Sequence, residues 1–159
     1  MKLIIDGYNL LHASGVFGAG RGERAFEESR RALLDLLADL LGPEAGQAVV
    51  VFDAARAPDG LPGRYTHRGL RVWFAREYPD ADSLIEELVA DATSPHLVVV
   101  SNDRRLQAAA RRRRARAVPC TEWLAEARAA RRQATQADDA KPAEPGPDGA
   151  EYWKRYFDL

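Results

Sequence analysis

Short apolar runs alternate with segments of helical periodicity along most of this chain, and this alternation constrains the fold more than any other feature. Between the runs, apolar residues recur at helical spacing, as in the segment from Phe26 to Leu41, which ends before Gly42 and Pro43. Strands that are apolar without polar alternation are typical of a parallel sheet that helices cover on both faces. The runs expected to form strands occupy residues 3–5, 48–52, 70–74, 97–100 and 117–118.

These elements predict an α/β fold with a doubly wound arrangement, because right-handed crossovers place helices on both faces of the sheet. We expect a mainly parallel five-stranded sheet in the order 3-2-1-4-5, counted along the chain. The Gly-rich residues 15–22 and the Pro/Gly-rich residues 54–69 are expected to form loops. Ligands bind such sheets outside the carboxyl ends of the strands, where the winding reverses between the first and fourth strands.

The final part of the chain differs in composition from the rest. A length of 159 residues suits one domain with a short appendage. Residues 133–149 are polar and rich in Ala, Asp and Pro, and aromatic and basic residues follow them. We therefore predict a folded domain over residues 1–132, a flexible linker over 133–150 and an aromatic-basic tail over 151–159.

Acidic residues follow three of the predicted strands. Asp6, Asp53 and Asp103 lie at or just beyond the ends of strands one, two and four, and Asp82 opens the helix that leads into strand four. Strands two, one and four are expected to be neighbours, so these carboxylates and Asn9 should converge at one edge of the sheet. Close like charges are costly unless a cation lies between them. Carboxylate oxygens suit Mg²⁺ or Mn²⁺, so the pattern indicates a metal site.

Each aspartate also has a simpler interpretation. An Asp that follows a strand often caps a helix or forms a turn. Asp82 could cap its own helix, with Glu86 interacting favourably with the helix dipole, and Asp53 could hold loop backbone. The coincidence of four aspartates at one sheet edge favours a site over separate caps.

Four motifs resemble those of NYN domains, and of their YacP-like branch in particular. Residues 4–11, IIDGYNLL, are similar to the opening motif, and residues 50–54, VVFDA, to the second motif. Residues 81–86, ADSLIE, resemble the acidic-helix motif, and residues 100–103, VSND, the end of strand four. The resemblance covers roughly residues 1–125 in the family's order, and it implies a PIN-like sandwich with a nuclease domain.

The resemblance also implies roles for individual residues. By position in the motifs, Asp6, Asp82 and Asp103 are the implied ligands of a metal ion, Mg²⁺ or Mn²⁺. Asn9 becomes a polar partner of the site, and Asp53 a supporting acid.

The activity implied by the resemblance is hydrolysis of RNA phosphodiester bonds by a metal-dependent ribonuclease, which we expect to be an endoribonuclease. RNA is the implied partner, with ribosome-associated mRNA as one candidate source. One difference from the family pattern is Asn102, which stands in the Ser-Asp step after strand four. This difference bears on the direction in which the Asp103 carboxylate points.

Two other functions remain open. The same fold without cleavage would be a non-catalytic RNA-binding NYN domain, against which the presence of all the motif acids argues. A small-molecule phosphohydrolase with an aspartyl-phosphate intermediate would usually carry a second acid two residues after the nucleophile and a lysine near the fourth strand. Tyr8 occupies the first of these positions, and the predicted core has no lysine beyond Lys2, so this alternative is disfavoured.

The net charge of −1 conceals an uneven distribution of arginine. Seven arginines lie between Arg104 and Arg116, on and after the helix that follows Asp103. Such runs usually form a solvated helix face, but this one has few balancing acids and begins at the predicted site. We therefore predict a track for RNA phosphates and expect RNA affinity to fall steeply with salt. The residues assigned to this track are Arg104, Arg105, Arg111 and Arg112.

The remaining sequence features concern location and covalent links. The first apolar run is too short for a signal peptide and no stretch could span a bilayer, so we expect a cytoplasmic protein without a membrane partner. Cys120 is the single cysteine, which excludes an intrachain disulfide and disfavours a cysteine-based zinc site. The sequence leaves the oligomeric state open.

Overall fold

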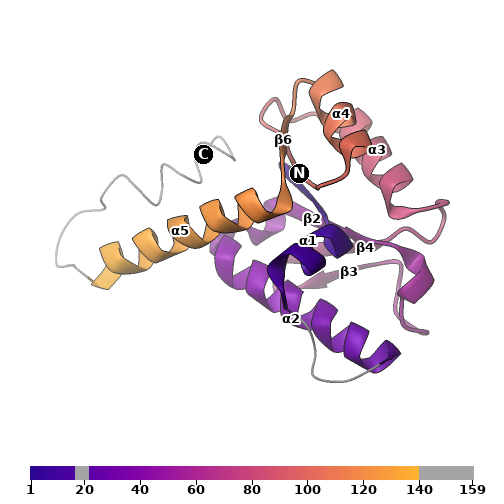
Figure 1. The fold of residues 1–159 in the computed structure, drawn as a ribbon, viewed down its shortest axis with the longest axis horizontal. Helices are drawn as coiled ribbons and strands as arrows, with labels where there is room; N and C mark the ends of the chain where they lie inside the picture. The colour runs from indigo at the N-terminus through magenta and orange to yellow at the C-terminus, as the bar shows by residue number, and fades with distance from the viewer. Residues whose placement is uncertain (17–21, 140–159) are drawn as a thin grey trace.

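A six-stranded mixed sheet forms the centre of the protein in a computed structural model, which describes residues 1–16 and 22–139 (Figure 1). The strand order is β3-β4-β2-β1-β5-β6, and every neighbouring pair is parallel except β3 and β4. Ile5 in the central strand pairs with Val50 on one side and with Val100 on the other. The strands are β1 (Leu3–Asp6), β2 (Ala48–Phe52), β3 (Arg64–His67), β4 (Leu70–Phe74), β5 (Val98–Val100) and β6 (Arg116–Val118).

Helices cover both faces of the sheet, as expected for strands that are buried throughout. One core lies between the sheet and the first, second and fifth helices, and a second core lies between the sheet and the third and fourth helices (Figure 1). Alternate strand residues enter the two cores, with Ile5 in the first and Ile4 in the second. The helices are α1 (Gly7–Ser14), α2 (Glu23–Leu41), α3 (Ala81–Asp91), α4 (Arg104–Arg112) and α5 (Cys120–Asp139), with short 3-10 turns η1 (Gly42–Gln47) and η2 (Ala54–Arg56).

The predicted α/β class and the order of the five predicted strands are confirmed, but the strand count is wrong. The additional strand β3 lies within residues 54–69, which were expected to form a loop, and pairs antiparallel with β4. A two-residue turn joins the two strands, with positive φ angles of 48° at Arg68 and 91° at Gly69. The side chains of β3 alternate between exposed and half-buried, so the sequence has no continuous apolar run at this strand.

Helix α1 has no clear signal in the sequence, because it begins directly after β1 without an intervening loop. Its buried residues Leu10 and Leu11 join the first core. The strand-to-helix step is tightly packed, since a Cβ atom at Gly7 would overlap the ring of Phe52. This packing fixes the backbone next to Asp6, the last residue of β1.

The predicted linker begins too early, because α5 continues to Asp139 and residues 133–139 are helical. The Ala and Gln residues of this stretch have high helix propensity, which extends the helix beyond its last buried residue, Ala130. The rest of the predicted linker and the aromatic-basic tail lie outside the described residues. None of the helices in the described part of the chain combines the length and apolarity needed to cross a membrane.

Candidate functional site at the carboxyl edge of the sheet

Three aspartates from three different elements come together at the carboxyl edge of the sheet. Asp6 ends β1, Asp103 follows β5 and begins α4, and Asp82 lies in the first turn of α3. Strands β1 and β5 are parallel neighbours, so their carboxyl ends meet at one edge. The charges of Asp6 and Asp103 both raise the pKa of Asp82, which reflects the proximity of all three carboxyl groups.

Asp6 is the most deeply buried of the three, with 4% of its surface exposed. Its Oδ2 accepts a 2.9 Å hydrogen bond from the hydroxyl of Ser101. Burial raises the pKa of Asp6. Hydrogen bonds from the Ser101 hydroxyl and from the backbone amide of Asn9 lower this pKa, and the charge of Asp103 raises it. The net direction is upward, so the ionised form of Asp6 lacks full compensation.

Asp82 does not cap its helix, in contrast to the simpler interpretation of this residue. The N-cap of α3 is Asp80, whose Oδ1 accepts 2.7 Å hydrogen bonds from both the backbone amide and the hydroxyl of Ser83. Partial burial, followed by the charges of Asp103 and Asp6, raises the pKa of Asp82 to about 6. Because Asp80 serves as the cap, the Asp82 carboxylate is available to face the other two acids.

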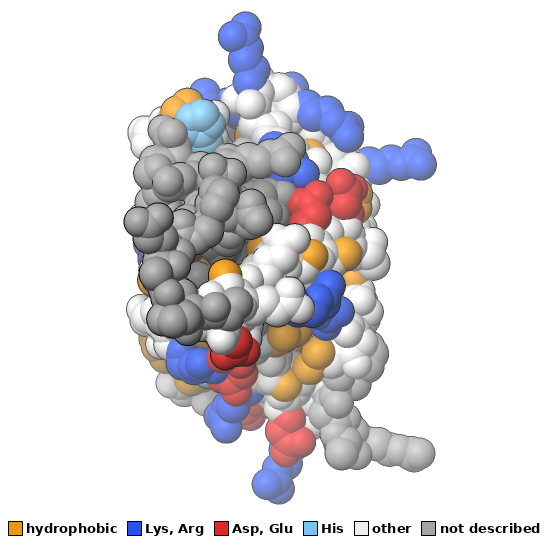
Figure 2. Space-filling model, turned by 90° about the vertical axis from the view of Figure 1, so that its left-hand side faces the viewer, with side chains coloured by type: hydrophobic (Ala, Val, Ile, Leu, Met, Phe, Trp, Pro, Cys, Tyr) orange, Lys and Arg blue, Asp and Glu red, His pale blue; other side chains and the backbone are white. Residues whose placement is uncertain are grey.

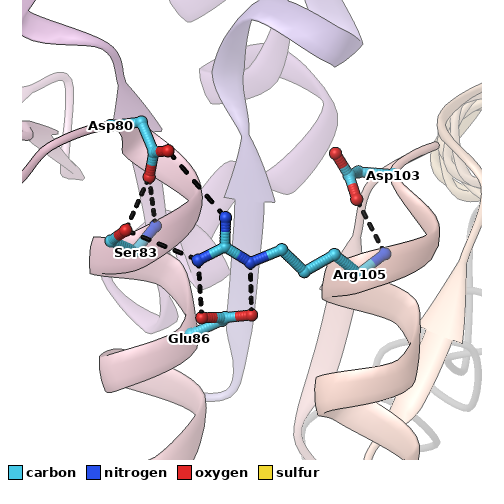
Figure 3. A network of polar contacts seen from close by, with 5 residues as sticks. All are labelled: Asp80, Ser83, Glu86, Asp103 and Arg105. Carbon is cyan, nitrogen blue, oxygen red and sulfur yellow. Dashed lines mark hydrogen bonds and ion pairs between the residues drawn. The ribbon is translucent and has the colours of Figure 1, made fainter.

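Asp103 both caps a helix and belongs to the acidic group. Its Oδ1 accepts a 2.7 Å hydrogen bond from the backbone amide of Arg105 at the start of α4 (Figure 3). The backbone amide of Asp103 donates to the Ser101 hydroxyl at 3.0 Å. A capping aspartate is stabilised by the helix dipole, which holds negative charge at this position. Ser101 is fully buried, and its hydroxyl links the Asp6 carboxylate to the backbone of Asp103 through these two hydrogen bonds.

Asn9 and Asn102 hold the turn that carries Asp103. The Oδ1 of Asn9 accepts from the backbone amide of Asn102 at 3.0 Å, and the Oδ1 of Asn102 accepts from the amide of Cys120 at 2.8 Å. Asn102, which differs from the family pattern, therefore anchors the turn to α5. Asp103 nevertheless lies close enough to Asp6 and Asp82 for its charge to raise their pKa values, so the presence of Asn102 before it does not direct its carboxylate away from the site.

Asp53 is not brought into this group. Its Oδ1 accepts a 3.0 Å hydrogen bond from Ala55, which caps the short turn η2 after β2. The interactions that shift the pKa of Asp6 and of Asp82 do not include Asp53. The loop-holding interpretation therefore describes its observed contacts.

Arg105 is engaged by acids next to the site, and its assignment to a phosphate track stays a prediction. Its Nε and Nη2 donate to the two carboxylate oxygens of Glu86 at 2.7 and 2.9 Å, and its Nη1 lies 3.8 Å from Asp80 (Figure 3). This bidentate pair joins α4 to α3. The Arg105 side chain nevertheless stays 48% exposed.

The other predicted phosphate contacts have open side chains. Arg104, Arg111 and Arg112 are exposed on α4, and the described residues give their side chains no hydrogen bond or ion pair. Figure 2 shows Lys and Arg side chains projecting from the upper end of the molecule, where α4 lies in Figure 1. Arg113 differs, because its guanidinium donates to the carbonyls of Val89 and Ala92 at the end of α3.

The donor set of the acidic group is compatible with a hard divalent cation. Mg²⁺ is usually held by one or two carboxylates together with waters. A cation would stabilise the ionised carboxylates against burial, which is the largest cause of the raised pKa of Asp6 and Asp82, and against their mutual repulsion. Within residues 1–16 and 22–139, no group of three or more His, Cys, Asp or Glu side chains is placed so that it could hold a metal ion as the side chains stand. Asp6, Asp82 and Asp103 are thus a convergent acidic group rather than a finished coordination shell.

Three residues of this region were missed by sequence reasoning. Ser101 was noted only as part of the strand-four motif, Asp80 stands two residues before the motif acid Asp82, and Glu86 was considered only for the helix dipole. A signal for Asp80 exists, because an Asp three residues before Ser83 is a normal N-cap arrangement. The roles of Ser101 and Glu86 depend on partners from other elements.

Comparison with known proteins identifies relatives over nearly the whole chain. The model of the YacP-like NYN domain family matches residues 3–155. The protein YacP of Bacillus subtilis (strain 168) is 33% identical over 86 residues, which cover 54% of this chain and 49% of that protein. The matched region thus spans about half the length of that relative.

Two crystal structures of Rae1 (YacP) from Bacillus subtilis share the fold. A mutant form matches with a TM-score of 0.60 and 25% identity over 98% of this chain and 92% of that chain. A second structure matches with a TM-score of 0.62 and 26% identity over 87% of this chain and 80% of that chain. Together with the family match, this similarity shows that the chain belongs to the YacP-like NYN domain family, within the PIN-like nucleases.

Proposed function

We propose that this protein is a metal-dependent ribonuclease that cuts RNA internally, with Asp6, Asp82 and Asp103 as the ligands of Mg²⁺ or Mn²⁺. The observation that carries the proposal is the convergence of these three carboxyl groups from β1, α3 and the start of α4. Family membership supports RNA as the substrate class, since NYN domains are nucleases.

The residues around the acids would keep them in place. The Ser101 hydroxyl orients Asp6, and the turn held by Asn9 positions Asp103. The pairing of Arg105 with Glu86 holds α4 against α3 and so keeps Asp103 near Asp82. When bound, the divalent ion supplies Lewis acidity at the phosphate and stabilises negative charge there.

RNA would approach along α4. Arg104, Arg111 and Arg112 are exposed, and their guanidinium groups suit bidentate phosphate contacts. We propose these three residues as the phosphate track, without Arg105. Messenger RNA on the ribosome remains a candidate source of the RNA substrate. The cytoplasmic location expected from the sequence stays a prediction.

The decisive experiment compares Asp82→Asn with Asp91→Asn on labelled RNA in Mg²⁺ or Mn²⁺. Asp91 is an exposed aspartate at the end of the same helix, so it controls for loss of one acidic charge. Loss of a residue that only supports a metal ligand costs about 10- to 100-fold. We expect the loss of a direct ligand in Asp82→Asn to reach or exceed this range, while Asp91→Asn retains activity.

Two further readouts separate the proposal from its alternatives. Mg²⁺ or Mn²⁺ should raise the melting temperature of the parent protein and of Asp91→Asn but not that of Asp82→Asn, because a ligand stabilises the state that binds it. Mapping both ends of the products distinguishes internal from terminal cleavage. RNA binding by all three proteins without metal-dependent cleavage would instead identify a non-catalytic RNA-binding domain.

A further inference from the structure

A second site lies away from the acidic group, between α2 and the strand β3 of the hairpin. A cavity of about 110 Å³ opens there, and α2 supplies Arg30 and Arg31 to its lining while β3 supplies Tyr65 and His67. A single water needs only about 10–15 Å³ of such space, so the cavity has room for a small anion. None of these residues takes part in the site described above.

Arg30 is the unusual residue of this cavity. It is only 3% exposed, and the described part of the chain provides neither an ion pair for its guanidinium nor a hydrogen-bond acceptor for its Nη1. The guanidinium carbon lies 5.2 Å from the centre of the Phe74 ring, which supports the charge from one side. A buried cation with an unsatisfied donor is costly, which indicates that this group is kept for an acceptor from outside the chain.

The charge balance of the cavity favours an anionic ligand. Glu27 is its one acidic lining residue, and it already pairs with Arg31 at 3.9 Å. His67 is hydrogen-bonded to Asp35 at 2.8 Å, so the Asp35 carboxylate is directed to the imidazole. Arg30 therefore remains as a surplus positive charge at the cavity wall.

Tyr65 adds a hydroxyl group close to this charge. Burial raises the pKa of Tyr65, and both the charge of Arg30 and a hydrogen bond from its side chain lower it, so one part of the guanidinium is already directed to the phenol oxygen. The Tyr65 ring stacks on Phe74 with their centres 6.1 Å apart, so the hydroxyl is held by a packed side chain. A guanidinium with a neighbouring phenol provides several donors in a fixed geometry, which suits the oxygens of a phosphate group.

We propose that the cavity between α2 and β3 binds a phosphate group through Arg30, with Arg31 and Tyr65 as further contacts. The phosphate can come from an RNA backbone or from a free phosphate ion, since both present the same oxygens. Only the RNA source rests on the proposed ribonuclease function. Binding of inorganic phosphate does not, so the two proposals can fail separately.

The test is a titration of the full chain with inorganic phosphate in EDTA, at constant ionic strength adjusted with sodium chloride. The readout is the NMR signal of the Arg30 Nε–H group, which reports on the guanidinium directly. We expect a saturable shift in the parent protein and about tenfold weaker binding in Arg30→Lys, which keeps the charge but loses the planar fork.

Exposed variants guard against a folding defect at the buried Arg30. Arg31→Gln should weaken phosphate binding several-fold, whereas Arg24→Gln should leave it within about twofold. Arg24 is a matched control, because it lies on the same helix and forms a similar i,i+4 ion pair with Glu28 at 3.6 Å. Tyr65→Phe removes only the hydroxyl and should also weaken binding.

The source of the phosphate follows from a competition in the same buffer. A short single-stranded RNA that displaces phosphate from Arg30 identifies the RNA backbone, and saturable phosphate binding that RNA does not displace identifies free phosphate. The absence of a saturable Arg30 shift overturns the proposal. Equal weakening by Arg31→Gln and Arg24→Gln also overturns it, because it would show only general attraction of anions.

Discussion

The hydroxyl of Ser101 donates a 2.9 Å hydrogen bond to Oδ2 of Asp6, although the two residues are 95 positions apart in the chain. The hydroxyl oxygen of Ser101 in turn accepts a 3.0 Å hydrogen bond from the backbone amide of Asp103. Because β1 and β5 are parallel neighbours, a residue just past the end of β5 reaches the acid at the end of β1. One buried hydroxyl thus coordinates the positions of two of the three acids.

Replacing Ser101 by Ala should shift the pH dependence of metal binding and cleavage. The Ser101 hydrogen bond lowers the pKa of Asp6 against the effect of burial, so its loss should raise that pKa further. The ionised carboxylate would then require a higher pH, and metal affinity at neutral pH should fall about tenfold. The measurement is the pH profile of Mn²⁺ binding and of RNA cleavage. Ser29→Ala is the control, since Ser29 is a buried serine whose hydroxyl donates to the backbone carbonyl of Ala25 within α2. An identical pH profile for Ser101→Ala and the parent protein would contradict the role of Ser101.

Asp82→Asn should stabilise the metal-free protein at high pH. The pKa of Asp82 is raised from 3.8 to about 6, so the folded protein holds its proton more tightly than the unfolded chain does. This contribution to the free energy of unfolding is fully present below about pH 4 and is lost as the pH rises through about 6. Since Asn carries no charge, the variant should be more stable than the parent by about 1 kcal/mol at pH 8, after allowance for solvent screening.

Urea unfolding at several pH values, without divalent cations, checks this prediction. The stability difference between Asp82→Asn and the parent should be larger at pH 8 than near pH 4. Asp91→Asn should show no such trend, because Asp91 is exposed and lies at the other end of α3. A difference that grows toward low pH would show that Asp82 is stabilised as the charged form.

Arg104→Gln and Arg105→Gln should separate RNA binding from stability. Arg104 is exposed without a described partner, so its loss should weaken RNA binding in EDTA and reduce the slope of log affinity against log salt by about 1. Arg105 pairs with Glu86 and Asp80, so its loss should lower the free energy of unfolding by freeing two acids near the site. Fluorescence anisotropy over a salt series and urea unfolding measure the two effects. A larger reduction of the salt slope in Arg105→Gln than in Arg104→Gln would return Arg105 to the phosphate track.

Gly7→Ala should destabilise the protein and disturb the site. A Cβ atom at this position would overlap the ring of Phe52, which is fully buried, so the strand-to-helix step next to Asp6 would have to move. Overpacking of this kind costs about 1 to 3 kcal/mol. Gly46→Ala is the control, because a Cβ atom there meets open space. Equal melting temperatures for the two variants would show that the Gly7 region relaxes without cost.

The sequence by itself determined the class of fold and the central order of strands. The buried runs of β1, β2 and β5 are continuous and apolar, and such patterns are local, so they can be read without knowledge of partners. Parallel order then places Asp6 and Asp103 at one edge, and the short connection into α3 adds Asp82. The family motifs led to the same three acids.

Only the tertiary structure decided which side chains serve each other. Asp80 rather than Asp82 caps α3, Asp53 holds its own loop, and Arg105 pairs with Glu86 across two helices. The half-exposed strand β3 became visible only through its pairing with β4. Hydrogen bonds and ion pairs of this kind depend on distances between residues that are far apart in the chain, and several acceptable partners exist for each polar group. Their selection is therefore made by packing, which the local pattern of residues does not encode.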